Sequence, residues 1–198
     1  MYKLKLYLIR HGKTEANEKR LYCGVTDISL TKEGREELVK LKKPYRDIDG
    51  YYTTGLKRTN ETMNILFDTC KYVVEEGFRE YNFGDFEMKG YEELKTLKDY
   101  INWIEDTEGN YIIKNGESKK QYRERTKLTF KSFINKLIKE NKKNVILVCH
   151  GGTIGTILEE FYSNEKDLFK WQPPCGRGYV LNILINNENI RISSISNI

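Results

Sequence analysis

The sequence predicts an α/β fold in which a mainly parallel central sheet is flanked by helices on both faces. Three observations predict it. Short apolar runs that suit buried strands alternate along the chain with longer segments of helical periodicity. The most regular helical segment stands directly before the apolar run "NVILVC". The chain has 198 residues, which is enough for one domain with a sizeable core.

Six segments are predicted as strands. The first, "KLYLIR", lies around residues 4–10 and has the apolar character of a buried strand. "DGYYT" and "KYVVEE" are expected to form two shorter strands, and "NVILVC" a further buried one. "YVLNILI" and "NIRISSI" then close the chain as a hairpin.

Four segments are predicted as helices. "LTKEGREELVKLKK" follows Ser29 and contains Thr31, whose hydroxyl suits a helix N-cap. "GLKRTNETMNILFD" and "TIGTILEEFY" are expected to follow the second strand and the "NVILVC" strand. The long segment "SKKQYRERTKLTFKSFINKLIKEN" shows apolar residues near a period of 3.6. They are Tyr122, Phe130, Phe133, Ile134, Leu137 and Ile138.

The middle of the chain, from about residue 78 to 117, is less regular and rich in tyrosine, glycine and acids. An irregular segment of this length in a compact domain is typical of a cover over a functional site. We therefore expect a single domain over residues 1–198, with a small insertion at about 78–117 that covers the site.

Composition excludes several classes of protein. The net charge of +5 is mild, and the lysines are interleaved with glutamates, so no nucleic-acid partner is expected. No apolar run approaches a membrane span, and the first apolar run is too short for a signal peptide. The four cysteines form no C-x-x-C pair, which argues against structural zinc and disulfides. We expect a cytoplasmic protein without a membrane partner.

The only two histidines carry the strongest functional signal. His11 and His150 each follow an apolar strand directly and each precede a glycine. In open α/β sheets, ligands bind beyond the carboxyl ends of the strands. The two histidines are therefore expected at the same edge of the sheet, and they meet if their strands are neighbours. The alternative is two unrelated structural histidines.

Several kinds of chemistry do not fit this pair. A metal site needs more ligands at short spacing. A serine hydrolase needs a G-x-S-x-G elbow, which is absent. Cys149 has no arginine shortly after it, as a cysteine phosphatase would require. A nucleophilic imidazole remains.

The surroundings of His11 suit a phosphoryl group. An arginine fork such as that of Arg10 binds phosphoryl oxygens in a bidentate manner. Its charge also lowers the pKa of His11 and so favours the neutral, nucleophilic imidazole. Gly12 lets the backbone approach a ligand closely, and the "HGGT" turn into a helix offers amide donors to an anion.

The stretch "LIRHGKTEAN" resembles the signature of the histidine phosphatase superfamily, which has the phosphoglycerate-mutase-like fold. "LYCGVTDISLTKEG", "TTGLKRTNET", "FREYNFGDFEM" and "VCHGGTIGTIL" are similar to further motifs of this family, in family order. The resemblance covers most of the chain. It implies a three-layer sandwich with a small insertion over the site. Thr59 departs from the family pattern, in which alanine usually follows the second arginine.

The resemblance also implies roles for individual residues. His11 is the expected nucleophile, and Arg10, Arg58 and His150 are expected to surround the phosphoryl group. Glu80 is the expected general acid, with Asp85 and Glu87 as rivals. Asn17 is expected to contact phosphate or, alternatively, to cap a turn. The remaining expected phosphate or substrate contacts are Cys23, Gly24 and Gly151. No metal or cofactor is required.

The substrate class follows from finer resemblances. The chain is shorter than typical mutases of the family and lacks their proline-rich loop, so a phosphomonoesterase is favoured. "LYCG", "YNFGDFEM" and "NGES" are similar to bacterial alpha-ribazole phosphatases, which remove the 5′-phosphate of an alpha-ribazole nucleotide in assembling the lower loop of cobalamin. The alternatives are a broad-specificity or sugar-phosphate phosphatase, then a phosphoglycerate mutase or a non-catalytic member that binds a phosphorylated ligand.

Two features of the sequence leave alternatives open. The aromatic residues of the middle segment either stack on the base of a substrate or form the core of the insertion. They are Tyr81, Phe83, Phe86, Tyr91 and Trp103. The tryptophans and the edge of the closing hairpin are also compatible with a homodimer.

Overall fold

The computed structural model describes residues 2–163, 165, 167–186 and 189–198. Its centre is a sheet with the strand order β3-β2-β4-β1-β5-β6. The strands are β1 Tyr2–Arg10, β2 Gly50–Thr53, β3 Val73–Val74, β4 Asn144–Cys149, β5 Gly178–Asn186 and β6 Asn189–Asn197. The first four pair in parallel, whereas β5 and β6 add an antiparallel hairpin at one edge. The predicted class, with its mainly parallel sheet, is confirmed.

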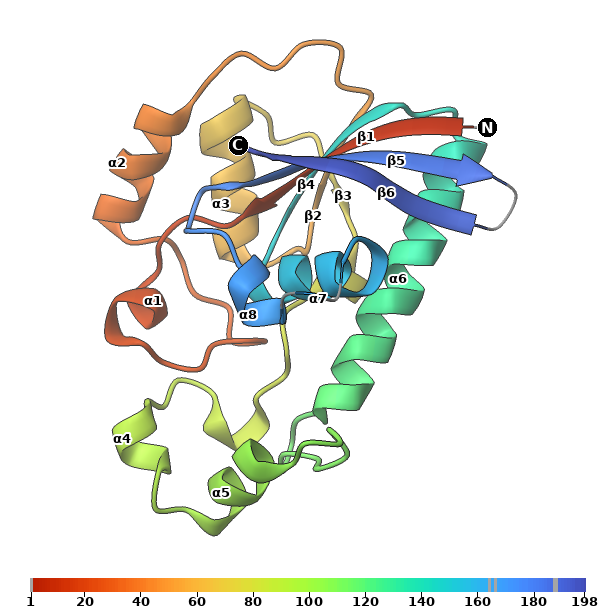
Figure 1. Cartoon of the computed structure of the whole chain (residues 1–198). Helices are drawn as coiled ribbons and strands as arrows, with labels where there is room; N and C mark the ends of the chain where they lie inside the picture. Colours follow the sequence, from red (N-terminus) through yellow and green to blue (C-terminus); the bar gives the residue numbers. More distant parts are fainter. Residues whose placement is uncertain (1, 164, 166, 187–188) are drawn as a thin grey trace.

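Helices cover both faces of this sheet, which confirms the three-layer sandwich (Figure 1). One face carries α2 (Lys32–Leu41) and α3 (Lys57–Phe67), and the other carries α6 (Lys119–Lys139) and α7 (Gly151–Phe161). Each face therefore has a core of its own. Continuous apolar strands fit this arrangement, because both of their faces are buried.

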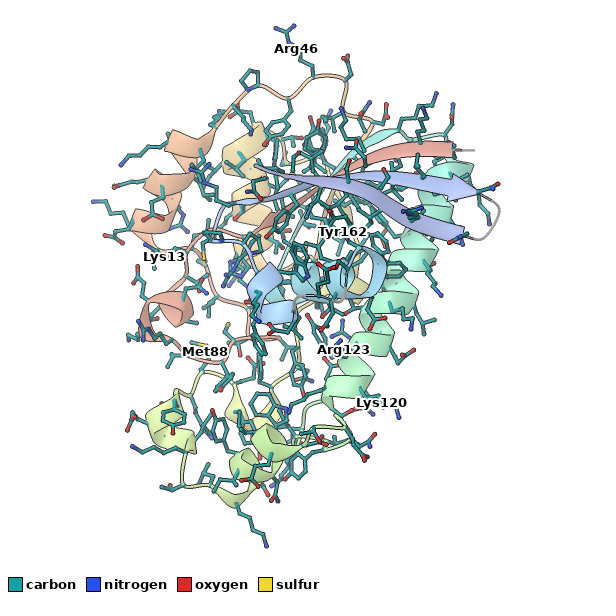
Figure 2. All side chains as sticks on the ribbon, in the orientation of Figure 1. Lys13, Arg46, Met88, Lys120, Arg123 and Tyr162 are labelled. Carbon is teal, nitrogen blue, oxygen red and sulfur yellow. The ribbon has the colours of Figure 1, made fainter. Side chains whose placement is uncertain are left out.

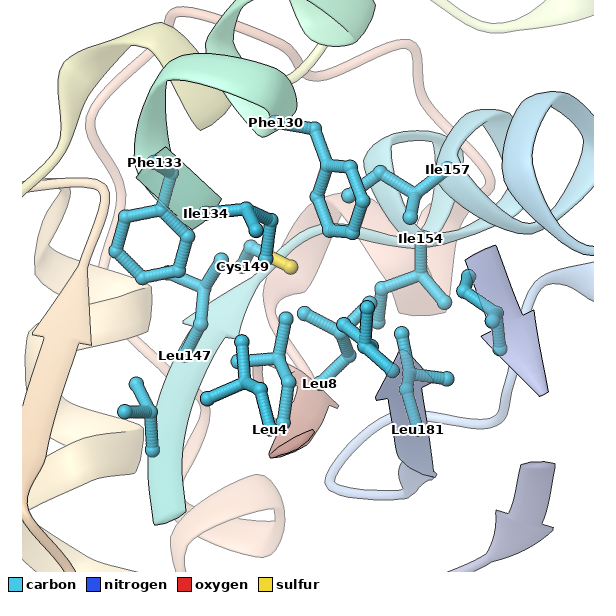
Figure 3. Packing of buried hydrophobic residues seen from close by; sticks show 14 of the residues in the cluster. Leu4, Leu8, Phe130, Phe133, Ile134, Leu147, Cys149, Ile154, Ile157 and Leu181 are labelled. Atoms are coloured by element: carbon cyan, nitrogen blue, oxygen red, sulfur yellow. The ribbon is translucent and has the colours of Figure 1, made fainter. Parts of the chain in front are cut away.

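The larger core lies under the long helix α6 (Figure 3). Phe130 and Ile134 of α6 pack with Leu147 of β4 and Ile154 of α7, and all four side chains are fully buried. Burying one such side chain stabilises the fold by about 1.5–3 kcal/mol. This packing orients α6 and α7 against β4, and the first turns of both helices reach the candidate site.

The starts of two predicted helices are confirmed by their caps. The hydroxyl of Thr31 accepts a hydrogen bond from the amide of Gly34 at the start of α2. At the start of α6, the hydroxyl of Ser118 accepts from the amide of Gln121, and the Gln121 side chain accepts from the amide of Ser118. This reciprocal capping box stabilises the first turn of a helix.

Several short elements are absent from the prediction. They are α1 Glu15–Lys19, α4 Tyr91–Leu94, α5 Lys98–Glu105, α8 Leu168–Trp171 and the 3₁₀ turns Glu76–Phe78 and Gly84–Phe86. Helices of one or two turns are too short to show a hydrophobic period. The predicted third strand shrinks to the two exposed residues of β3.

The middle segment forms a small lobe around α4 and α5, beside the sheet layers (Figure 1). The lobe has an aromatic core of its own, made by Tyr81, Phe86, Leu94, Tyr100, Trp103, Ile113 and Tyr122. Both ends of the lobe meet at Arg125 of α6. Its guanidinium donates to the carbonyls of Gly77, Arg79 and Glu80 at the start, and to the Glu117 carboxylate at the end.

None of the helices in the described ranges is long and apolar enough to cross a bilayer.

Candidate active site

His11 and His150 lie together at the carboxyl edge of the sheet. Strands β1 and β4 are parallel neighbours whose last residues, Arg10 and Cys149, are paired. The residues that follow the two strands therefore leave the sheet side by side. The two imidazole centroids are 5.3 Å apart, with the rings inclined at 64°. The sequence pattern of strand, histidine and glycine therefore produces one site from residues that are far apart in the chain.

The tautomer of His11 follows from its hydrogen bond. Nδ1 lies 2.7 Å from the carbonyl oxygen of Gly12. A carbonyl oxygen can only accept, so Nδ1 carries the proton and Nε2 of the neutral ring keeps a free lone pair. The His11 side chain is 6 % exposed and forms part of a cavity wall. Its Nε2 is thus the nucleophilic atom of the ring.

The electrostatic environment keeps both histidines neutral. Burial holds the pKa of His11 well below its ordinary value of 6.5, and the charge of Arg58 lowers that pKa further. Arg10, to which the sequence pattern attributes the effect, acts on the His11 pKa more weakly than burial or Arg58. Burial is also the first cause of the lowered pKa of His150, followed by Arg58 and His11.

His150 is oriented by two threonine hydroxyls. Its Nε2 lies 2.9 Å from the hydroxyl of Thr54, which lies 3.1 Å from the hydroxyl of Thr59. Thr59 donates to the carbonyl of Leu56, so Thr54 donates to Thr59 and accepts from His150 Nε2. The proton of His150 is therefore on Nε2. Its buried Nδ1 has no hydrogen-bond partner among the described residues.

Arg10 and Arg58 bring two positive charges to the cavity. Arg10 donates to the carbonyl of Pro173 at 2.8 Å, and its buried Nε has no partner in the described part of the chain. Arg58 is 1 % exposed and donates to the carbonyls of Gly24 and Thr26. Its Nε is likewise buried without a partner among the residues described. Both side chains line the cavity next to His11.

The loop that contains Cys23 and Gly24 is held from two sides. Arg58 donates hydrogen bonds to two carbonyl oxygens of the loop. The Glu87 carboxylate accepts hydrogen bonds from the amides of Gly24, Val25 and Thr26. Cys23 lines the cavity, and burial raises the pKa of its thiol. The thiol is therefore protonated at neutral pH, and its place on the cavity wall is compatible with the expected substrate contact.

Glu80 lies against the start of α7, and its neighbour Tyr81 approaches Gly24 of the loop through its backbone carbonyl. Its Oε2 accepts from the amide of Gly152 at 2.8 Å, and its Oε1 accepts from the hydroxyl of Tyr122 at 2.5 Å. The amide of Tyr81 also donates to Oε1, at 3.1 Å. Glu80 lines the same cavity as His11.

The two rival carboxylates occupy other positions. Glu87 is engaged by the loop amides and by the hydroxyl of Thr26 at 2.5 Å. Asp85 lies on the exposed side of the lobe, where Asn115 donates to it. Neither lines the cavity that contains His11. Geometry therefore favours Glu80 over both.

The glycines of the two histidine motifs are required for different structural reasons. A Cβ on Gly152 would lie 2.5 Å from Oε1 of Glu80, so glycine permits the acid to approach the helix. The amide of Gly152 donates to the Glu80 carboxylate, so this amide of the "HGGT" turn is not available to a bound anion as expected. Gly151 lines the cavity against the guanidinium of Arg10. A Cβ on Gly12 would meet Leu38 of α2, so Gly12 is explained by packing rather than by ligand approach.

Asn17 caps the start of α1, as the second of the two alternatives predicts, and it also lines the cavity. Its Oδ1 accepts from the amide of Thr14 at 3.0 Å, while its own amide donates to the Thr14 hydroxyl. The oxygen of the side chain is thus used by the α1 cap. The side-chain NH₂ is the donor that a ligand would meet.

The cavity has a volume of about 530 Å³ and a lining of two kinds. Arg10, His11 and Arg58 make a polar part. The apolar part comes from the loop after α1, from the lobe and from α8, with Tyr22, Phe83, Trp103, Ile104, Leu168 and Phe169. Arg123 reaches the wall from α6, while neighbouring Lys120 points to solvent (Figure 2). Arg123 is already paired with Glu159 and Glu160.

The described residues contain no cluster of three or more His, Cys, Asp or Glu side chains that would hold a metal ion. Next to His11 the positive charge comes from Arg10 and Arg58, and Lys119 and Arg123 also line the cavity.

Three contributors to the site were missed by sequence reasoning. Tyr122 belongs to the apolar face of α6, so its hydroxyl is hidden by the helical pattern. Thr54 has no motif of its own, and Thr59 appears only as a departure from the family pattern. Of the two alternatives for the aromatic residues of the lobe, the core is confirmed, because Tyr81 and Trp103 belong to it. Both side chains also line the cavity.

The fold and the site define a known class. The chain belongs to the histidine phosphatase superfamily, branch 1, whose family model matches residues 6–197.

Its relatives include both phosphatases and mutases. The adenosylcobalamin/alpha-ribazole phosphatase of Salmonella typhimurium is 28% identical over 163 residues, which cover 78% of each chain. A Yersinia enterocolitica protein named probable phosphoglycerate mutase GpmB is 32% identical over 163 residues, covering 78% of this chain and 73% of that protein. The crystal structure of the Shigella flexneri alpha-ribazole phosphatase has a TM-score of 0.76 at 24% identity, covering 97% and 96% of the two chains. The last likeness shows the shared fold.

Proposed function

We propose that this protein is a phosphomonoesterase that works through a phosphohistidine on Nε2 of His11. The observation that carries the proposal is the free lone pair of Nε2 at the wall of a cavity that the half-buried Arg10, the buried Arg58 and Glu80 also line. A neutral imidazole with this tautomer is a competent nucleophile. Arginine guanidinium groups are suited to the charge that develops on phosphoryl oxygens.

The proposed reaction has two steps. In the first, Nε2 of His11 attacks phosphorus, the bond to the ester oxygen breaks, and Glu80 gives that oxygen a proton. In the second, water attacks phosphorus, Glu80 takes a proton from the water, and the P–N bond breaks with its electron pair returning to Nε2. Arg10 and Arg58 hold the phosphoryl oxygens throughout. Nδ1 of the neutral His150, which has no partner among the described residues, carries a lone pair and can accept a hydrogen bond from a protonated phosphoryl oxygen.

The proposed substrate is alpha-ribazole 5′-phosphate. The apolar part of the cavity supports this, because the aromatic rings of Tyr22, Phe83 and Trp103 suit a flat heteroaromatic base. The similarity to the Salmonella alpha-ribazole phosphatase supports it as well. A broad-specificity or sugar-phosphate phosphatase is the alternative within the same chemistry.

A phosphoglycerate mutase is the second candidate, and its basis is the similarity to GpmB. A three-carbon acid would leave the apolar part of the cavity unfilled. Its carboxylate would need a cation beyond the phosphoryl site. Arg123 is already engaged by two glutamates, and Lys119 donates to the carbonyls of Ile104 and Asp106. These contacts favour the phosphatase.

Phosphate release in EDTA tests the proposal on alpha-ribazole 5′-phosphate, O-phosphoserine, 3-phosphoglycerate and an aryl phosphate. We expect alpha-ribazole 5′-phosphate to have the highest kcat/KM and the His11→Gln variant to be inactive on all four. Equal kcat/KM for all four compounds would overturn the assignment of alpha-ribazole 5′-phosphate as the substrate but would leave the phosphohistidine mechanism standing. Interconversion of 3- and 2-phosphoglycerate faster than phosphate release would favour the mutase. Full activity in His11→Gln would overturn the phosphohistidine.

A further inference from the structure

Tyr122 connects the long helix α6 to the proposed acid. Its hydroxyl donates to Oε1 of Glu80 at 2.5 Å, and its side chain is 4% exposed. The ring lies 5.2 Å from the ring of Tyr81, and the guanidinium of Arg125 lies 5.2 Å from its centroid. The ring is thus held by contacts with Tyr81 and Arg125, in addition to the hydrogen bond of its hydroxyl.

The direction of this hydrogen bond is defined by the groups around it. An ionised carboxylate only accepts, so Tyr122 is the donor. Thr153, the other neighbour of the phenol at 3.2 Å, has the carbonyl of Phe78 as its own acceptor at 3.2 Å. Burial raises the pKa of Tyr122 well above its ordinary value, and the charge of Glu80 adds to this. The phenol keeps its proton across the working pH range.

The two oxygens of Glu80 are used unequally. Oε1 accepts two hydrogen bonds, from the Tyr122 hydroxyl and the Tyr81 amide. Oε2 accepts one, from the amide of Gly152. A carboxylate oxygen has two lone pairs in the carboxyl plane, so Oε1 is saturated and Oε2 keeps one lone pair open.

We propose that Tyr122 is a positioning residue that occupies Oε1 of Glu80 and thereby makes Oε2 the atom that exchanges the catalytic proton. In the first step, Oε2 carries the proton and releases it to the ester oxygen. In the second step, Oε2 takes a proton from the attacking water. This inference rests on the proposed phosphatase activity, because it deepens the role given there to Glu80.

Leaving-group dependence provides the test. The Tyr122→Phe variant loses only the hydroxyl and keeps the ring. An aryl phosphate such as p-nitrophenyl phosphate has a leaving group that departs without a proton, whereas an alkyl phosphate such as glycerol 2-phosphate needs one. General acid catalysis contributes about 10²–10⁴-fold. We therefore expect kcat/KM of Tyr122→Phe to fall at least about tenfold for the alkyl ester and to change less than about threefold for the aryl ester.

Two further variants complete the experiment. Tyr100→Phe is the matched control, because it removes another buried tyrosine hydroxyl, which bonds to Tyr22 and does not touch Glu80. It should leave the ratio of alkyl to aryl kcat/KM unchanged. In a Glu80→Gln background, Tyr122→Phe should cause no additional loss on the alkyl ester, because the proton-exchanging group is already gone.

The outcomes separate the two proposals. Wild-type protein that hydrolyses neither ester would overturn the phosphatase. Active wild type with equal losses on both esters in Tyr122→Phe would leave the phosphatase standing and overturn the positioning role. The positioning role would also be overturned if the losses in kcat/KM on the alkyl ester caused by Glu80→Gln and Tyr122→Phe were fully additive in the double variant.

Discussion

The hydroxyl of Thr54 lies 2.9 Å from Nε2 of His150 and fixes the proton of that ring on Nε2, away from Nδ1, which has no partner among the described residues. Thr59 completes the relay by accepting from Thr54 and donating to a backbone carbonyl. The threonine that departs from the family pattern therefore has a function in this chain. It determines which nitrogen of a completely buried histidine presents a lone pair.

Substituting Thr54→Val removes that acceptor while the side chain keeps its shape. A buried donor left without a partner costs about 1–3 kcal/mol, so we expect the free energy of unfolding to fall by that amount. Because His150 then loses its fixed tautomer, kcat/KM should fall by about tenfold or more on aryl and alkyl phosphates alike. Urea unfolding and phosphate-release assays measure the two effects.

Thr126→Val is the matched control for this prediction. Thr126 is fully buried in α6, and its hydroxyl has no partner among the described residues. Its removal should leave both activity and stability near the wild-type values. Wild-type kcat/KM in Thr54→Val would show that the relay does not orient His150.

Stability should decrease as pH falls through the range in which unfolded histidine titrates. The pKa of His11 and that of His150 are both held well below 6.5 by burial, so the folded chain stays unprotonated where the unfolded chain takes up two protons. The unfolded state then binds more protons, and folding loses free energy as pH decreases. For two such histidines the loss between pH 6.5 and 5.5 is about 2 kcal/mol.

Urea denaturation at a series of pH values measures this dependence. The chain has only two histidines, so the slope in this window is assigned to them alone. Replacing either one by glutamine should halve the loss. A free energy of unfolding that is flat between pH 7 and about 5.5 would contradict the predicted neutral pair.

Gly152→Ala should displace the proposed acid. The new Cβ would lie 2.5 Å from Oε1 of Glu80, whose carboxylate must shift away from the amide that holds Oε2. We expect kcat/KM on alkyl phosphates to fall by on the order of 10- to 100-fold. Alanine is the better helix former, so thermal stability should change little. Gly90→Ala is the control, because its Cβ would make only ordinary contacts, at 3.4 Å or beyond.

Phe169→Ala tests the apolar part of the cavity. This side chain is 75% exposed, so its removal should not alter folding. If it covers the base of the substrate, KM for alpha-ribazole 5′-phosphate should rise about three- to tenfold, because one aromatic contact contributes about 0.5–1.5 kcal/mol. KM for O-phosphoserine should stay unchanged. Leu128→Ala, another exposed apolar side chain outside the cavity, serves as the control. Equal changes in KM for both substrates would contradict this placement.

The long elements and the edge of the sheet could be predicted from sequence because local patterns determine them. Apolar continuity marks β1 and β4, and their parallel pairing brings His11 and His150 together. The relay from Thr54 and the hydrogen bond from Tyr122 could not be predicted in this way. Each depends on a hydroxyl whose partner is more than forty residues away, and no local period reports such a contact.

Gly12 and Gly152 show the same difference between what local sequence patterns predict and what distant contacts decide. Their sequence neighbours mark the candidate site, but the atoms that require glycine come from Leu38 of α2 and from Glu80 at the start of the lobe. Tertiary packing therefore decides what each glycine does. The short helices α4 and α5 were missed for a related reason, since the aromatic core of the lobe, and not a helical stripe, stabilises them.

The guanidinium of Arg125 holds both ends of the lobe, from Gly77 to Glu80 on one side and at Glu117 on the other. The intervening chain returns to the place where it left. Glu80 stands on the fixed side of this junction and is held there by α6 and α7. In the proposed phosphatase, the group that exchanges protons is therefore anchored outside residues 82–116, whereas Phe83, Trp103 and Ile104 of that segment line the cavity in which the alcohol would lie. Such a segment is a natural point at which one reaction can be adapted to new compounds.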